Sequence, residues 1–118
     1  MKSEDSRTCT VKGIKKVDTM KYQKSSEMIS ALANGSRIAI LDIMLEYGEV
    51  CACDLEIALG LPQPTVTSHL HKLYEVGLLL RREKWKFTYY SINPRHSDLI
   101  GVVLEKNNLP EKIVLKKE

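Results

Sequence analysis

Apolar side chains recur at helical spacing in two stretches near the amino end of the chain. The first stripe predicts a helix over about residues 19–33, and its members are Met28, Ile29 and Leu32. Ser36 can cap a second helix, over about residues 36–47, because its side chain can accept a backbone N–H bond. The second stripe is broader, which predicts that this helix is buried from two sides. Its apolar residues are Ile38, Ile40, Leu41, Met44 and Leu45.

Residues 51–76 contain two further helical stripes, separated by a tight break. Gly60 closes the first segment, and Pro62 and Pro64 lie where a helix can begin. Two helices joined by a short turn that contains glycine predict a helix-turn-helix, whose second helix enters the major groove of DNA. The stripes consist of Leu55, Ala58 and Leu59 before the break and of Val66, Leu70 and Leu73 after it.

The face of the second helix that lies opposite its apolar stripe is polar. Hydroxyl and amide side chains near the amino end of such a helix suit base edges and phosphates, and a lysine adds a charge that phosphates attract. The alternative is an ordinary solvated face in an all-α domain. His69 lies near the apolar stripe and is expected to be packed and hydrogen-bonded rather than a metal ligand. The residues predicted to contact DNA are Gln63, Thr65, Thr67, Ser68, His71 and Lys72.

The periodicity changes after Gly77, which is expected to end the second helix as a C′ glycine. Residues 78–92 are rich in aromatic and branched side chains and predict a two-stranded hairpin. A basic hairpin directly after a helix-turn-helix is typical of a wing that reaches the DNA backbone. The alternative is that the charges only keep an exposed hairpin soluble. The basic residues are Arg81, Arg82, Lys84 and Lys86, interleaved with Trp85 and Phe87.

A last helix is expected to start at Asn93-Pro94 and to end at about residues 107–110. Little of a monomer is left to cover its apolar face, which predicts that this helix and the first one pair with their symmetry mates in a two-fold homodimer. The expected fold class is therefore mainly α with a small β-hairpin, a winged helix-turn-helix with helical dimerisation elements at both ends. The apolar residues of the last helix are Leu99, Ile100, Val103 and Leu104.

Length and charge fit this picture. With 118 residues the chain has room for one domain with a small core. We expect a flexible arm over residues 1–18, the winged helix-turn-helix domain over residues 19–109 and a tail over residues 110–118. The net charge of +3 permits a nucleic-acid partner without requiring one. A winged helix can also serve as an assembly module, but an exposed polar face beside a basic hairpin favours DNA.

Several other classes are disfavoured. No run of about eighteen apolar residues and no secretory signal is present, so we expect a cytoplasmic protein with no membrane partner. No nucleophile–base–acid set or glycine-rich phosphate loop is found, so we expect neither an enzyme nor a catalytic cofactor. Three cysteines in a reducing compartment argue against a structural disulfide framework.

The order of elements resembles that of the ArsR/SmtB family of winged-helix repressors. The likeness rests on LANGSRIAIL (32–41), CACDLEIALGLPQPTVTSHLHKLYEVGLL (51–79) and WKFTYYSINP (85–94). Cys-x-Cys-Asp-Leu at 51–55 looks like the thiol pair that arsenic-, cadmium- and lead-responsive members carry before the recognition helix. The resemblance implies a homodimer that binds a double-stranded DNA operator and represses a resistance or homeostasis operon until an inducer arrives. The chain departs from the arsenic-sensor pattern at Glu56, where that pattern has a third cysteine.

Cys51 and Cys53 lie at a predicted helix start, where exposed N–H groups favour the thiolate that binds soft ions. Residues two apart on a regular helix do not face each other, so the sulfurs converge only if Cys51 lies in the entering turn or the helix start unwinds. With Cys9 the site offers three sulfurs, which suit As(III), Sb(III), Bi(III) or Pb(II), whereas Cd(II) prefers a fourth ligand. The alternatives are inert core thiols or a redox switch. A disulfide between residues two apart is expected to be strained, which favours Cys9 or the other subunit as the partner.

Overall fold

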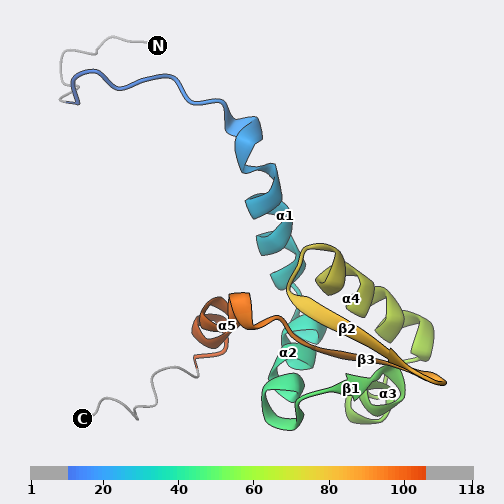
Figure 1. Cartoon of the computed structure of the whole chain (residues 1–118). Helices are drawn as coiled ribbons and strands as arrows, with labels where there is room; N and C mark the ends of the chain where they lie inside the picture. Colours follow the sequence, from blue (N-terminus) through green and yellow to red (C-terminus); the bar gives the residue numbers. More distant parts are fainter. Residues whose placement is uncertain (1–10, 106–118) are drawn as a thin grey trace, which may run out of the picture.

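The computed structural model describes residues 11–105 and contains every element that the sequence predicts. Helix α1 extends away from a body formed by α2, α3, α4 and the strands, and α5 lies on the opposite side of that body from α4 (Figure 1). Residues 11–18, part of the predicted arm, contain no helix or strand, and the predicted tail lies outside the described residues. In chain order the elements are η2 (Thr19–Tyr22), α1 (Gln23–Leu32), α2 (Gly35–Tyr47), β1 (Val50–Cys51), α3 (Ala52–Leu59), α4 (Gln63–Glu75), β2 (Leu79–Lys84), β3 (Phe87–Ile92), η3 (Pro94–His96) and α5 (Ser97–Val103).

Helix α2 begins earlier than predicted. The side-chain oxygen of Asn34 accepts a hydrogen bond of 3.1 Å from the backbone N–H of Arg37, so Asn34 is the cap and Ser36 lies inside the helix. The prediction for Ser36 was wrong because Asn34, in an extended conformation, offers an equally good acceptor two residues earlier. Leu45, predicted to belong to the apolar stripe, is 42% exposed. Helix α2 packs against α1, α4 and β3, and its buried side chains Ile40, Leu41 and Met44 form an arc that leaves Leu45 beyond its edge.

One core holds the helices against the sheet. Full burial of one aliphatic side chain stabilises the fold by about 1.5–3 kcal/mol relative to exposure, so these side chains fix how α3 and α4 sit on α2. Helix α5 contributes Ile100 to the core but ends at Val103, before the end predicted near residues 107–110, which lie outside the described part. The fully buried large side chains are Ile40, Leu41, Leu55, Val66, Leu70, Leu73, Leu78 and Ile100.

The break between α3 and α4 follows from glycine and proline. Gly60 ends α3 with a φ of 66°, in the left-handed region that glycine adopts without strain. Pro62 then caps α4, and Pro64 lies in its first turn, where no intrahelical N–H bond is lost. Gly77 follows α4 with a φ of 87°. The predicted helix-turn-helix and both of its glycine terminators are confirmed.

The hairpin belongs to a sheet with a third strand that the sequence did not predict. The strand order is β1-β3-β2, with antiparallel neighbours. Strand β1 pairs Val50 with Tyr90 and Cys51 with Tyr89. We call β2, β3 and their connecting residues 85–86 the wing; Trp85 at its tip is 85% exposed. The strand that carries Cys51 is thus hydrogen-bonded to the wing.

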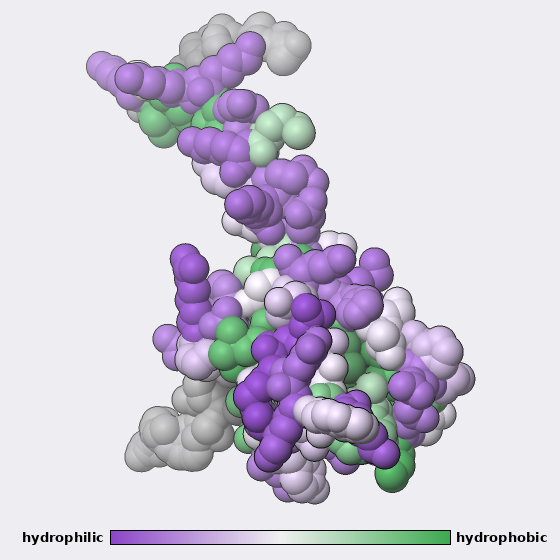
Figure 2. Space-filling model, turned by 45° about the vertical axis from the view of Figure 1, so that its right-hand side comes forward, coloured by the Kyte–Doolittle hydropathy of each residue, from purple (hydrophilic) through white to green (hydrophobic). Residues whose placement is uncertain are grey.

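Hydrophilic side chains cover much of the surface on which α4 and the wing tip come forward (Figure 2). All four basic residues predicted for the wing are exposed. Within residues 11–105 no single helix is long and apolar enough to cross a membrane; only the pair Thr19–Leu32 and Gly35–Tyr47, bent by 84°, passes that test, and by length and composition alone.

Candidate DNA-contact face and thiol site

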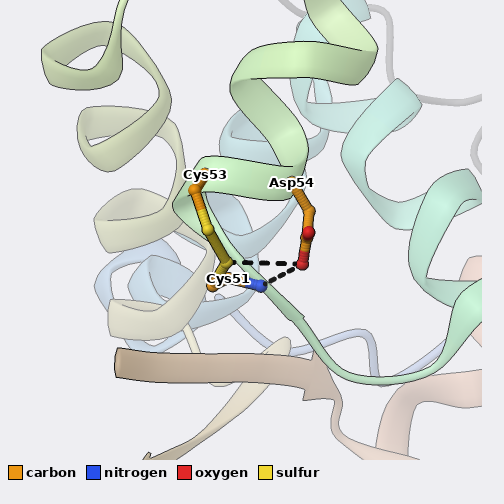
Figure 3. A group of neighbouring side chains, drawn as sticks. All are labelled: Cys51, Cys53 and Asp54. Carbon is orange, nitrogen blue, oxygen red and sulfur yellow. Dashed lines mark hydrogen bonds between the residues drawn. A yellow bond between two sulfur atoms is a disulfide. The ribbon is translucent and has the colours of Figure 1, made fainter. Parts of the chain in front are cut away.

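The two sulfurs predicted to form a site meet at the start of α3. Cys51 is the N-cap in an extended conformation, Cys53 lies in the first helical turn, and the two form a disulfide (Figure 3). The prediction that the sulfurs converge if Cys51 lies in the entering turn is confirmed. The prediction that strain would favour Cys9 or the other subunit as the disulfide partner was wrong, because Cys51 and Cys53 are bonded to each other. The extended backbone at Cys51 turns its side chain toward Cys53, and the Cα–Cα distance of 5.3 Å is ordinary for a disulfide.

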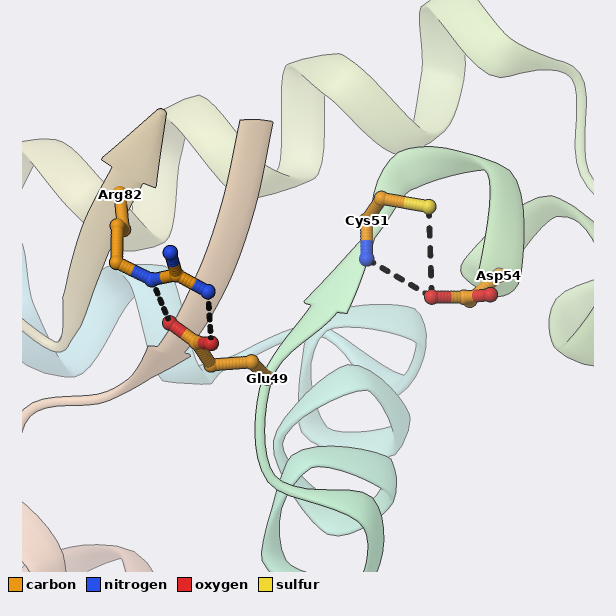
Figure 4. A network of polar contacts seen from close by, with 4 residues as sticks. All are labelled: Glu49, Cys51, Asp54 and Arg82. Carbon is orange, nitrogen blue, oxygen red and sulfur yellow. Dashed lines mark hydrogen bonds and ion pairs between the residues drawn. The ribbon is translucent and has the colours of Figure 1, made fainter. Parts of the chain in front are cut away.

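The carboxylate of Asp54 stabilises the start of α3 as part of a capping box. Its Oδ2 accepts a hydrogen bond of 2.9 Å from the backbone N–H of Cys51 and lies 3.4 Å from Cys51 Sγ (Figures 3 and 4). The contact with sulfur is a hydrogen bond only in the reduced thiol, because a disulfide sulfur has no hydrogen. The two sulfurs and a carboxylate oxygen of Asp54 lie within 4.8 Å of one another, so they form a candidate metal site once the disulfide is reduced.

The thiol pair opens into a groove between α3, α4 and the wing. Cys51 is only 6% exposed, whereas Cys53 is exposed, so a reagent reaches the pair from the side of Cys53. The groove has a volume of about 570 Å³. The lining residues are Cys51, Cys53 and Glu56 at and after the start of α3, Gln63, Thr67, Leu70 and His71 on α4, and Arg81, Lys86, Phe87, Thr88 and Tyr90 on the wing.

The polar residues predicted to contact DNA lie together on α4. Five of the six line a second, open hollow of about 680 Å³ on the outer side of that helix, namely Gln63, Thr67, Ser68, His71 and Lys72. The sixth, Thr65, is exposed on the first turn. Thr67 is half-buried and the other five are exposed. The polar face of α4 is therefore free of its own chain over the described residues.

Both arginines of the wing are engaged with residues outside the wing. The guanidinium of Arg81 lies 4.4 Å from the ring centre of Tyr74 on α4. The guanidinium of Arg82 donates two hydrogen bonds, of 2.7 and 2.9 Å, to the carboxylate of Glu49 (Figure 4). These bonds lower the pKa of Glu49 and raise the pKa of Arg82. Lys84 and Lys86 are exposed nearer the tip.

Sequence reasoning missed Glu49 and the capping role of Asp54. Glu49 directly precedes β1, so its bond to Arg82 ties the segment before the thiols to the wing. No local pattern marks that pairing, because the two residues are 33 positions apart. The cap does have a sequence signal, since Asp54 lies three residues after Cys51, at the spacing of a capping box. Cys9, the predicted third ligand, lies outside the described residues.

His69 is packed and hydrogen-bonded, as predicted. Its Nδ1 lies 3.2 Å from Nη1 of Arg37, whose Nε also donates a 2.6 Å hydrogen bond to the carbonyl of Ala31. Burial lowers the pKa of His69, and the positive charges of Arg37 and Lys72 lower it further. The neutral imidazole is therefore favoured at this position.

Comparisons with known proteins agree with this geometry. A family model described as "Bacterial regulatory protein, arsR family" matches residues 34–79, which span α2, α3 and α4. The chain is 34% identical over 87 residues to a helix-turn-helix transcriptional regulator of Methanocaldococcus jannaschii, covering 72% of this chain and 97% of that one. It is 32% identical over 93 residues to the arsenical resistance operon repressor of Staphylococcus xylosus, covering 79% of this chain and 88% of the repressor.

A solved structure carries the same fold. The homodimeric winged helix-turn-helix DNA-binding domain of a Mycobacterium bovis protein superposes with a TM-score of 0.69 at 23% identity, over 92% of this chain and 97% of that domain. The predicted winged helix-turn-helix and the resemblance to the family are thus confirmed, as is the expectation that the chain is no enzyme. The chain belongs to the arsR family of bacterial regulatory proteins, which are transcriptional regulators with a winged helix-turn-helix DNA-binding fold.

Proposed function

We propose that this regulator is a homodimeric repressor that leaves its DNA operator when a soft metal or metalloid binds Cys51 and Cys53. The observation that carries the proposal is the groove that the two cysteines share with α4 and the wing. A ligand bound to the two sulfurs would therefore lie beside α4 and the wing, the elements proposed to bind DNA. Its relative in Staphylococcus xylosus is named an arsenical resistance operon repressor, which supports an inducer of this class. A repressor of this kind acts where the DNA is, in the cytoplasm.

Helix α4 would read the operator in the major groove, with the wing beside it on the backbone. Short polar side chains at the amino end of α4 suit base edges, and Lys72 suits a phosphate. Lys84 and Lys86 extend the positive surface toward the neighbouring backbone. Arg81 contacts the ring of Tyr74, and Arg82 is bonded to the carboxylate of Glu49. Each arginine must therefore give up that contact before it can bind DNA.

A second copy of the chain would cover the apolar surfaces of α1 and α5. Ile29 on α1 is 64% exposed, and Val102 on α5 is 60% exposed. The Mycobacterium bovis domain of the same fold is described as homodimeric. A two-fold dimer presents two copies of α4 to successive major-groove turns, about 34 Å apart, of a near-palindromic site.

The inducer would be As(III), Sb(III), Bi(III), Pb(II) or Cd(II), with Cys9 as a third ligand where three sulfurs are needed. Binding spreads the two sulfurs apart and disturbs the start of α3. Helix α4 packs directly on α3, and β1 is paired with the wing. A distortion at the start of α3 is therefore transmitted to both elements proposed to bind DNA. Lowering DNA affinity by a factor of about a hundred to ten thousand requires roughly 3–5.5 kcal/mol of differential binding, which a few metal–sulfur bonds can supply.

A second candidate function is redox sensing, and the disulfide between Cys51 and Cys53 favours it. Hydrogen peroxide would oxidise the two thiols to the disulfide and be reduced to two molecules of water. Oxidation and metalloid binding use the same sulfur lone pairs, so one excludes the other at this site.

The test is a gel shift on the upstream region of the regulator's own gene, with random duplex as the control. The reduced protein on DNA is titrated in parallel with As(III), Sb(III), Cd(II), Pb(II), Zn(II) and hydrogen peroxide. Cys51→Ser and Cys53→Ser should retain operator affinity and lose the response to metalloid. A full response to arsenite in either variant would place the effector site elsewhere. Release by peroxide alone would favour the redox function.

A further inference from the structure

The described thiol site supplies two sulfurs, and the donor clustered with them is a carboxylate oxygen. The carboxylate of Asp54 is within 4.8 Å of both sulfurs, and Glu56 lines the same groove. Carboxylates are hard donors and suit arsenic and similar soft centres poorly. Within residues 11–105, Cys51 and Cys53 are the only thiols. The ligand that suits this pair by itself is therefore one that needs two sulfurs and no more.

Trivalent arsenic forms three bonds, and the third substituent decides how many thiols it needs. Inorganic arsenite bound to two thiols keeps one hydroxyl group, which exchanges with water and other thiols. A trivalent arsenical with one organic group already has a stable carbon–arsenic bond, so two thiolates complete it. An arsine oxide R–As=O and two protein thiols give R–As(S-Cys)₂ and one molecule of water. The two thiol protons go to the oxygen, arsenic stays trivalent, and the disulfide must first be reduced by a phosphine or a dithiol.

The groove beside the pair has room for the organic group. An apolar cavity of about 150 Å³ is large enough to hold a benzene ring, and this groove measures about 570 Å³. Phe87, which is 44% exposed, supplies aromatic surface in its wing wall, and the buried side chains of Leu70 and Tyr90 lie beneath the groove. Cys53, the exposed member of the pair, faces the approach from solvent.

Resting on the proposed function, we propose that the preferred inducer is a trivalent arsenical with one organic substituent, held by Cys51 and Cys53 with its substituent in the groove. Gln63, Thr67 and His71 form the opposite wall, so the substituent occupies part of the surface proposed to face DNA. The ligand then opposes DNA binding directly as well as through the start of α3. A larger substituent should therefore release DNA more completely than a hydroxyl group does.

The test compares phenylarsine oxide with sodium arsenite on wild type and on Cys9→Ser, both reduced with a phosphine that is then removed. Intact mass and free-thiol counts report binding without DNA, and the gel shift reports release. We expect phenylarsine oxide to consume two thiols per chain in both proteins and to act at a concentration about tenfold or more below that of arsenite. Arsenite acting equally well or better overturns the inference and leaves metalloid sensing standing. Failure of both reagents to bind the pair overturns this inference and the proposal that the site senses arsenic.

A pair of tryptophan variants tests the groove. Thr88→Trp fills it from the wing, whereas Leu80→Trp places the same ring at an exposed position of β2 that does not line the groove. Thr88→Trp should raise the concentration of phenylarsine oxide that half-saturates the thiols by about fivefold or more and leave arsenite binding unchanged. Leu80→Trp should change neither. If a folded Thr88→Trp protein binds phenylarsine oxide normally, the ring does not lie in the groove. Thr88→Leu, with less added volume, serves if the tryptophan variant does not fold.

Discussion

Replacing Asp54 by alanine should destabilise the protein and sensitise it to inducer at the same time. The Asp54 carboxylate holds the backbone N–H of Cys51 at 2.9 Å and keeps the start of α3 wound. A metalloid on Cys51 replaces the thiol proton, so the hydrogen bond from that thiol to the same carboxylate in the reduced protein is lost. Its binding therefore works against this cap. Removing the cap weakens the folded state and also lowers the cost of distorting α3.

The magnitude follows from the cap. Loss of one side-chain cap at a helix start costs about 0.5–2 kcal/mol of stability, typically about 1 kcal/mol. For a domain of about 60–100 residues this lowers the melting temperature by about 4–8 °C per kcal/mol. In wild type, inducer binding must supply the free energy that breaks this cap, whereas the variant has no cap to break. If most of that roughly 1 kcal/mol is saved, the variant should need about fivefold less inducer, because 1.4 kcal/mol corresponds to a factor of ten.

Two measurements on each variant check this reasoning: thermal unfolding by circular dichroism, and arsenite-dependent release of operator DNA. Glu46→Ala is the control, because it removes the same charge from an exposed helix position outside the thiol groove and leaves the cap in place. It should unfold near the wild-type temperature and respond to arsenite as wild type does. An Asp54→Ala protein that melts earlier but needs more arsenite would refute the argument and make the carboxylate a ligand of the inducer.

Three further results are expected. Glu49→Gln should release Arg82 for DNA, raising affinity for random duplex and steepening the dependence of log affinity on log salt by about 0.9, whereas Glu83→Gln should not. The pKa of His69 is lowered in the folded protein, so stability should be full above about pH 6.5 and fall as the pH drops toward the folded pKa; thermal melts of His69→Gln should lack this decline. Leu55→Ala, at a fully buried position, should lose about 2–5 kcal/mol in urea unfolding, against about 0.5 kcal/mol or less for the exposed Ile57→Ala.

The helices and the wing could be predicted because their signals are local. Periodic leucines, Gly60 and Gly77 fix where helices run and stop, and these depend on residues close in sequence. Strand β1 has only two residues, too short to show any period, and exists because β3 offers it a free edge. The polar face of α4 could also be predicted, because locating the apolar stripe of a helix locates the face on its opposite side.

The sequence predicted that Cys51 and Cys53 form the thiol site, but it did not predict that they are bonded to each other. The rule that residues two apart on a helix face apart holds inside a helix, and Cys51 lies one step outside it. The partner of Arg82 could not be predicted, because that contact depends on how the segment before β1 meets the wing. Packing between segments that are far apart in sequence decides which of the exposed basic side chains pairs with a carboxylate.

Trp85 has a practical consequence. It is the only tryptophan in the 118 residues and stands 85% exposed at the tip of the wing. The protein thus carries its own optical probe at the point expected to meet the sugar–phosphate chain. Its emission spectrum and its quenching by acrylamide follow that single position without any attached dye, so the docking and departure of the wing can be timed in a stopped-flow instrument.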